Sequence, residues 1–326
     1  SGGVATLSAN SDGWTALSAS GGIYVNSDGS LSLYSVASDT GLYLAAAGVT
    51  SYSGEADEEE DFDVTTLGYI NAPVIDLTIK GEADVGTVDH ALRVNTEGIK
   101  PVELTIRGKD PSDSVGNVYV QTVNDGTLQL TGFSSAGEIS VAAHGLSVTG
   151  ALSAQNDVVL TSQSDMSLES VSSAAGSVAA DSQSSLSAGA ITAENDVTLT
   201  SASDMTLDTV TSRNGCISAT SKGALTATQA LTAKSDITLD SAGDMAIATV
   251  RSNEGSVSAK ALGALSVADH SELSAQSGTL SLNGAPVQLG DSLTVRVNGL
   301  NLETTGDLLL KGSTVTVGTD GLALTS

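Results

Sequence analysis

One theme is written three times in the second half of the chain. The copies begin at Asn156, Asn195 and Ser235 and read NDVVLTSQSDMSLESV, NDVTLTSASDMTLDTV and SDITLDSAGDMAIATV, offset by 39 and then 40 residues. A half-length echo runs through the same region. Its aliphatic residues recur with half that offset, at Val158, Val178, Val197, Ile217, Ile237 and Val257. A period near 20 built from short apolar runs indicates a solenoid protein.

Within one period the apolar residues occur in pairs. In the first copy the pairs are Val158 with Leu160 and Met166 with Leu168, followed by Val171. A spacing of two is the period of a β-strand, and no unit contains the run of about ten residues with 3.6-residue periodicity that a helix requires. The sequence therefore predicts an all-β fold, a right-handed parallel β-helix with about 20 residues and three short strands per coil.

The repeated apolar positions are predicted to face the core. Methionine occurs three times in the protein, once at the same place in each copy. The coils between the copies carry smaller residues at several of these positions. We therefore interpret the offset between the copies as a packing period, in which bulky and small layers alternate. The predicted core residues are Met166, Met205, Met245, Val158, Val197, Ile237, Leu186, Leu225 and Leu265.

The period divides one continuous solenoid into three parts. Residues 1–54 keep it and are predicted to form regular coils, as are residues 118–326. Residues 55–117 break it with an acidic run, three of the four prolines and five of the twelve basic residues. We expect longer coils there, with loops that leave the solenoid. Because loops on a rigid scaffold often carry function, a specific site is expected in this part first.

The segment from Glu55 to Asp63 reads EADEEEDFD, with seven acids in nine residues. Repulsion at this charge density predicts a solvated loop. Clustered carboxylates can also supply oxygen ligands to Ca²⁺, although the spacing matches neither an EF-hand nor a calcium-binding nonapeptide repeat. The candidate metal ligands are Glu55, Asp57, Glu58, Glu59, Glu60, Asp61 and Asp63.

The charge excludes some partners. A net charge of −26 argues against binding to nucleic acid or to an anionic membrane surface, since both require dense positive charge. No apolar run approaches the roughly 20 residues of a membrane-spanning helix, so this section is not expected to insert into a membrane. A single cysteine excludes an internal disulfide framework. The sequence opens without methionine and shows no polar cap at either end, so we expect the natural protein to extend in both directions.

No catalytic constellation stands out. His90, His144 and His270 lie far apart in the chain, and neither a GxSxG nor an HExxH motif is present. We therefore predict no catalytic residue and no cofactor, and expect a protein that is not an enzyme. Cys216 stands where the sister repeats have Ser177 and Ser256, so it is interpreted as a small residue at a turn.

Aspartates form two rows in the triplicate. One row precedes the methionines and the other begins the copies, namely Asp165, Asp204 and Asp244, and Asp157, Asp196 and Asp236. Members of a row would be two coils apart, roughly 9 to 10 Å, which is too far to share one ion. We expect each aspartate to accept hydrogen bonds from the backbone of its own turn.

The repeat style resembles that of a known family. The segments DVVLTSQSDMSLESV, ALTATQALTAKSDITLDSAGDM and GEADVGTVDHALRV are similar to passenger repeats of large bacterial exoproteins of the filamentous haemagglutinin type. The resemblance implies a secreted adhesin, exported by a two-partner or autotransporter route and displayed at the cell surface. It further implies a rod that acts as scaffold or attachment module, with a receptor or glycan of a host or neighbouring cell as partner. The Asn-Pro motifs of the secretion domain are missing, so an internal section is predicted.

Two alternatives stay open. Pectin lyases and phage tailspike depolymerases are also parallel β-helices, so the chain could cleave polysaccharides if acids, with Arg or Lys, cluster in a groove on one face. The acidity alone would also suit a calcium-stabilised section of a surface layer.

Overall fold

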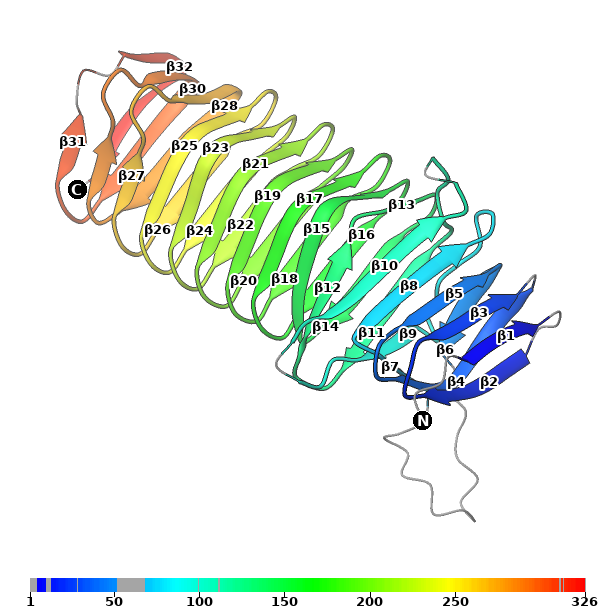
Figure 1. The fold of residues 1–326 in the computed structure, drawn as a ribbon. Coiled ribbons are helices and arrows are strands. Elements are labelled where there is room, and N and C mark those ends of the chain that lie inside the picture. The colour runs from blue at the N-terminus through cyan, green and yellow to red at the C-terminus, as the bar shows by residue number, and fades with distance from the viewer. Residues whose placement is uncertain are drawn as a thin grey trace. The chain divides into compact units, whose positions relative to one another are not determined.

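The regular elements that the structure describes are all β-strands. The computed structural model describes residues 5–9, 13–27, 29–51, 68–98, 100–110, 112–310, 312 and 314–325, and none of these lies in a helix. Corresponding strands of successive coils pair in parallel, as β18 does with β20, and form a β-solenoid of about 14 turns of roughly 20 residues each (Figure 1). The prediction of an all-β parallel solenoid is confirmed. The acidic segment 55–63 lies outside the described residues.

The chain divides into two compact units, residues 1–163 and 164–326. The strands of the first unit are β1 (Ala5–Ala9), β2 (Gly13–Ala19), β3 (Ile23–Ser27), β4 (Ser30–Ser38), β5 (Leu42–Ala46), β6 (Gly48–Ser51), β7 (Ile70–Asn71), β8 (Val74–Ile79), β9 (Leu92–Asn95), β10 (Val102–Gly108), β11 (Val118–Val123), β12 (Thr127–Thr131), β13 (Ser134–Ser135), β14 (Ile139–Ala143), β15 (Gly145–Ala154) and β16 (Val158–Ser162).

The strands of the second unit repeat more regularly. They are β17 (Met166–Ser173), β18 (Val178–Ser182), β19 (Leu186–Ala193), β20 (Val197–Ser201), β21 (Met205–Ser212), β22 (Ile217–Ser221), β23 (Leu225–Ala233), β24 (Ile237–Ser241), β25 (Met245–Ser252), β26 (Val257–Ala261), β27 (Leu265–Val267), β28 (Glu272–Gly284), β29 (Val287–Leu289), β30 (Thr294–Thr304), β31 (Leu308–Leu310) and β32 (Thr314–Thr325).

A regular coil contains a short strand such as β18 and a longer one such as β17. In β17 the inward residues are Met166, Leu168, Val171 and Ser173, so the inward phase shifts by one residue between Leu168 and Val171. A strict strand alternates with a period of two, and this shift lets one continuous strand supply two sides of the coil. The three apolar runs expected per coil are therefore present, but the second and third belong to one strand.

The core alternates bulky and small residues from coil to coil. In one inward row of the second unit, Leu199 pairs with Ala219 and Ala219 pairs with Leu239. Each methionine pairs instead with a leucine of the neighbouring coil, as Met205 does with Leu225. All nine residues proposed for the core are at most 1% exposed. In the row of Leu199, a large side chain of one coil thus faces a small one of the next, an arrangement that allows close packing of the layers.

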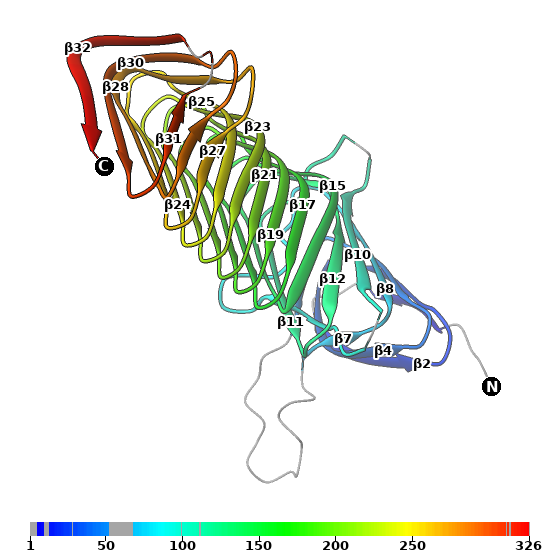
Figure 2. The same cartoon turned by 90° about the vertical axis from the view of Figure 1, so that its left-hand side faces the viewer.

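The first unit contains the longer coils. Leu42 pairs with Ile75, and Ile75 pairs with Leu104, so each of these two coils exceeds the regular period by about half. The following coil, from Val102 to Leu128, is longer by a smaller margin. The strands nevertheless stay in parallel register, and β8, β10, β12 and β15 follow one another across one face (Figure 2). The sheet therefore continues across coils of unequal length.

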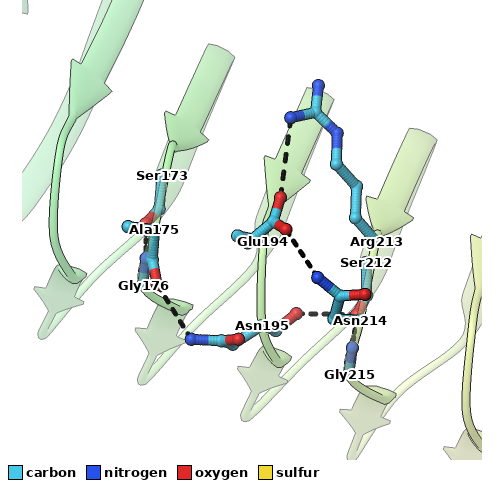
Figure 3. Close-up of polar contacts among 9 residues, drawn as sticks. All are labelled: Ser173, Ala175, Gly176, Glu194, Asn195, Ser212, Arg213, Asn214 and Gly215. Carbon is cyan, nitrogen blue, oxygen red and sulfur yellow. Dashed lines mark hydrogen bonds and ion pairs between the residues drawn. The ribbon is translucent and has the colours of Figure 1, made fainter.

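Buried serines hold the turns of successive coils together. Ser221 Oγ lies 2.7 Å from the carbonyl oxygen of Ser203 on the preceding coil and 3.0 Å from that of Ala224 in its own turn. At another corner, Ser212 Oγ donates to the carbonyl of Asn195 at 2.6 Å and accepts from the N–H of Gly215 at 3.0 Å (Figure 3). Each hydroxyl thus links the backbone of its own turn to the backbone of the preceding coil.

Candidate functional site

Two tyrosines on adjacent coils form an outward stack in the first unit. Tyr24 on β3 pairs in register with Tyr43 on β5, and their rings are parallel within 10°, with centroids 4.8 Å apart. Each ring lies back over a glycine: a Cβ on Gly22 would be 3.1 Å from Tyr24 Cε2, and one on Gly41 would be 3.3 Å from Tyr43 Cε2. Glycine at these positions leaves room for the rings. Tyr24 remains 44% exposed.

Charged residues continue this face on the next two coils. Asp76 on β8 follows Tyr43 in the same outward row, and Arg107 on β10 follows Thr78 in the neighbouring row. The Arg107 guanidinium donates to Asp76 Oδ2 at 2.7 Å and, through Nε, to Thr78 Oγ1 at 3.2 Å. Exposed ion pairs contribute only about 0–1 kcal/mol to stability. The pair therefore matters mainly for orienting the two side chains.

The carboxylate of Asp76 is only half satisfied. Its side chain is 21% exposed, and its Oδ2 accepts from Arg107. Its Oδ1 is covered and accepts no hydrogen bond from the part of the chain that the structure describes. Leaving a buried acceptor without a donor costs about 1–3 kcal/mol.

An asparagine stands at the opposite end of this face. Lys80 Nζ donates to Asn26 Oδ1 at 2.9 Å and to the carbonyl oxygen of Ser27 at 2.7 Å. Because the amide oxygen is engaged by Lys80, the amide NH₂ group of Asn26 is left to point elsewhere as a donor. The lysine thereby fixes which hydrogen-bonding group Asn26 offers.

Between these groups lies a hollow of about 250 Å³, which we call the tyrosine hollow. The small side chain of Ala45, set between Asn26 and Thr78 in its row, leaves space there. The surface is mainly apolar, with a few polar groups at its rim, as is usual for small-molecule sites. It is lined by Tyr24, Val25, Asn26, Tyr43, Leu44, Ala45, Asp76, Thr78 and Arg107.

A second, larger groove of about 620 Å³ lies at the turns of the same unit. Its charged lining residues are Asp39, Glu97 and Lys100. The buried side chain of Asn95 forms part of its wall, where Oδ1 accepts from the N–H of Glu97 at 3.0 Å and from Nδ2 of Asn124 at 2.7 Å. The groove thus places two acids and a lysine within one concave surface.

The aspartate rows bind differently from the expectation. Oδ1 of Asp196 accepts from the N–H of Cys216 at 2.8 Å, and Oδ1 of Asp244 accepts from the N–H of Ala264 at 2.8 Å. Asp204 and Asp236 repeat the contact with the next coil. The prediction that these four aspartates bond to their own turns was wrong, because the carboxylate reaches the N–H groups of the turn stacked beside it.

Glycine in the facing turn makes this contact possible. A Cβ on Gly215, Gly223, Gly255 or Gly263 would lie under 3.0 Å from Oδ1 of the aspartate in the preceding coil, closer than real Cβ atoms come. Where a serine faces Asp165 instead, its hydroxyl binds: Ser184 Oγ and Ser185 Oγ each donate to Oδ1 at 2.7 Å. These bonds, led by that of the Ser185 hydroxyl, hold the pKa of Asp165 below its ordinary value.

A tyrosine on β11 is held close to two acids. The Tyr119 hydroxyl donates to the Glu138 carboxylate. Partial burial, then this hydrogen bond and the charges of Glu138 and Asp84, raise the pKa of Tyr119 to about 12. At neutral pH the phenol is therefore a firmly held proton donor and plays a structural part.

The remaining candidates do not assemble into a site. His90, His144 and His270 lie in separate turns between strands, and Cys216 is half-buried, with its N–H donating to Asp196 of the preceding coil. Within the described ranges, no group of three or more His, Cys, Asp or Glu side chains could hold a metal ion. The same residues contain no helix long and apolar enough to cross a membrane. The proposed calcium ligands at 55–63 lie outside the described residues.

Sequence reasoning missed the tyrosine stack, although a signal was present. Ile23 and Leu42 lie one coil period apart, and Tyr24 and Tyr43 directly follow them. In register, two tyrosines one coil apart must be neighbours on the outer face. The structure also brings residues before 55 together with Asp76 and Arg107 from the irregular part.

Neither a family model, nor a curated protein, nor a solved structure matches this chain.

Proposed function

We propose that this chain is a stiff scaffold section of a secreted, surface-displayed attachment protein, as its resemblance to filamentous haemagglutinin-type exoproteins implies. The observation that supports a scaffold is the register of the second unit. The pairings β18–β20, β20–β22, β22–β24 and β24–β26 each join all residues of one strand to those of the next without a shift.

Stiffness follows from how each coil is tied to the next. Parallel strands form hydrogen bonds along every side of the coil, and the serine and aspartate contacts add further bonds at the corners. Bending a coil away from its neighbour would open all of these bonds together. In a solenoid each repeat contacts only its neighbours, so rigidity depends on such nearest-neighbour bonds.

Attachment requires a specific surface on this scaffold. We assign it to the tyrosine hollow, where two stacked rings, an acid and an arginine converge. The partner would be a receptor or glycan on a host or neighbouring cell, and the protein would act outside the cell. The flat faces, covered by small hydroxyl side chains, would act as spacers between such contact points.

Retention of coated beads tests the proposal. Beads carrying the chain and beads carrying an acidic, unrelated protein of similar net charge are passed over cultured host cells and over bacterial neighbours. Retention of the coated beads alone on at least one surface is expected. Equal release of both kinds of bead from every surface would contradict attachment.

The larger groove gives the polysaccharide-cleaving alternative one specific observation. Asp39 and Glu97 supply carboxylates, and Lys100 supplies a cation, in one concave surface of the first unit. Paired carboxyl groups of this kind carry out glycosidic bond cleavage in many enzymes. If the chain cleaves glycans, incubation with a polysaccharide panel releases oligosaccharides, and Glu97→Gln abolishes the release. Scaffold function predicts no release with either protein.

A further inference from the structure

We infer that the tyrosine hollow binds one uncharged pyranose unit of a glycan. The inference rests on the proposed attachment function and names the ligand class for it. Its starting point is the combination of apolar and polar groups. Tyr24, Tyr43 and Ala45 offer carbon surface, while Asp76, Asn26 and Arg107 stand at the rim.

The apolar part suits the C–H face of a sugar ring. Aromatic rings make up 3% of the chain, yet two of them are stacked outward on adjacent coils with one ring 44% exposed. Mutual stacking and the glycines beneath the rings fix their positions before any ligand arrives. A rigid aromatic surface costs little conformational entropy on binding, which is why tyrosine is frequent at recognition sites.

The polar part offers both acceptors and donors. Asp76 lines the hollow, and its Oδ2, which Arg107 holds in place, is the carboxylate oxygen offered as acceptor to a sugar hydroxyl. Arg107, whose side chain is 56% exposed, and the amide NH₂ group of Asn26 can donate to ring or hydroxyl oxygens. A sugar presents hydroxyls that both donate and accept, so it matches this mixed set.

Charge favours an uncharged ligand. Arg107 and Asp76 neutralise one another, and Lys80 adds one positive charge beside Asn26, which disfavours a cationic ligand in the hollow. The whole chain carries a net charge of −26, which repels polyanions at long range. The size agrees as well, since about 250 Å³ is below the range of roughly 300–1,000 Å³ usual for drug-sized ligands.

Ligand-observed NMR on the whole chain tests this inference. Methyl glucoside, methyl galactoside, methyl mannoside and methyl N-acetylglucosaminide are offered singly, with methyl glucuronide as the anionic arm and choline as the cationic arm. Saturation transfer to at least one neutral glycoside is expected, with a dissociation constant on the order of millimolar. Tighter binding of the glucuronide or choline, or transfer to none of the neutral glycosides, would overturn the inference.

Variants locate the site. Tyr43→Ala and Asp76→Asn should each weaken binding about tenfold, because the first removes a ring and the second replaces an accepting carboxylate oxygen with an NH₂ group. Tyr43→Phe keeps the ring and should stay within a few-fold of the wild type, which separates loss of contact from loss of folding. Thr105→Ala is the matched control: Thr105 follows Asp76 in the same outward row but does not line the hollow.

The outcomes separate this inference from the attachment function. If coated beads adhere to cells while Tyr43→Ala beads adhere equally, the hollow is not the contact point and attachment stands. If the neutral glycosides bind the hollow while no beads adhere, the site stands and the attachment function fails. Equal binding of glycosides by the wild type and by both Tyr43→Ala and Asp76→Asn would contradict the site itself.

Discussion

Asp244 and Gly263 fit one another across two neighbouring coils. The aspartate Oδ1 accepts a hydrogen bond from the N–H of Ala264 at 2.8 Å, and a Cβ on Gly263 would come under 3.0 Å from the same oxygen. The same pairing recurs between Asp204 and Gly223. At these two positions a glycine in the next coil makes room for the aspartate, whereas Asp165 of the same row faces Ser184, whose hydroxyl donates to it.

Gly263→Ala should lower stability through this collision. The added Cβ would meet Oδ1 of Asp244, while the nearest backbone atoms are 3.0 Å away or more. We expect a loss of roughly 1–3 kcal/mol, measured by thermal or urea unfolding. Asp244→Ala alone should cost about 1 kcal/mol, the value of one hydrogen bond.

The double variant Gly263→Ala with Asp244→Ala decides the cause. Removing the carboxylate removes the main obstacle, so the double variant should lose less than the sum of the single losses. Additive losses would mean that the glycine is needed for another reason.

The alternation of large and small core residues predicts that substitutions at Ala219 and Leu199 have non-additive effects on stability. Ala219 is fully buried between Leu199 and Leu239, so Ala219→Leu should overpack the layer and cost about 1–3 kcal/mol. Leu199→Ala should cost about 2–5 kcal/mol by opening a cavity. The two together restore the layer volume, and unfolding should show a smaller loss than their sum. A double variant as unstable as that sum would refute the packing interpretation.

Acid should reveal the role of Asp165. Its pKa lies below the ordinary 3.8 because the Ser185 and Ser184 hydroxyls and the Ser185 N–H donate to the carboxylate. A carboxyl group whose pKa is lower in the folded than in the unfolded state stabilises the folded protein at any pH above its unfolded pKa. This stabilisation is lost as the pH falls through the pKa of the folded state. The difference in Tm between wild type and Asp165→Asn should therefore shrink as pH drops below 3.8.

The serines supply the control for Asp165. In a Ser184→Ala, Ser185→Ala double variant, NMR titration of the side-chain carboxyl should place the Asp165 pKa closer to 3.8. An unchanged pKa would show that the hydroxyls do not lower it.

Alkali tests the contact of Tyr119 with Glu138. The pKa of Tyr119 is about 12 in the folded protein against 10.0 ordinarily, so stability should fall as pH rises from 10.0 to about 12. In a spectrophotometric titration, one tyrosine should ionise later than the others. Glu138→Gln should lower this late pKa, and Tyr119→Phe should remove the late phase. Ionisation of Tyr119 together with the other tyrosines would contradict the assignment.

The fold could be predicted from the sequence because it follows from a local period. The apolar pairs at Val158 with Leu160 and at Met166 with Leu168 indicate strands, and their regular return along the chain indicates stacked coils. The hydrogen-bond donor to Asp196 could not be predicted in the same way. Its donor, the N–H of Cys216, lies on the next coil and becomes a neighbour only through the relative placement of two turns.

The candidate site, too, could be predicted from the sequence only in part. The spacing of Tyr24 and Tyr43 could have predicted their stack, since both follow residues of the coil period. Asp76 and Arg107 could not be added to it from spacing, because the coils that separate them from Tyr43 are longer than the regular ones and unequal to one another. Only the register of the strands shows which outward residues of such unequal coils lie side by side.

The stacking of coils in register is the central claim, and a spin-label distance tests it most directly. Labels are placed at Ala179 and Ser258, four coils apart along one outward row, with Cys216→Ser as background. Four strand spacings predict one narrow distance distribution, with the two backbones about 19 Å apart. A broad distribution, or a mean separation of the backbones more than one coil spacing away from that value, would contradict a stiff, in-register solenoid.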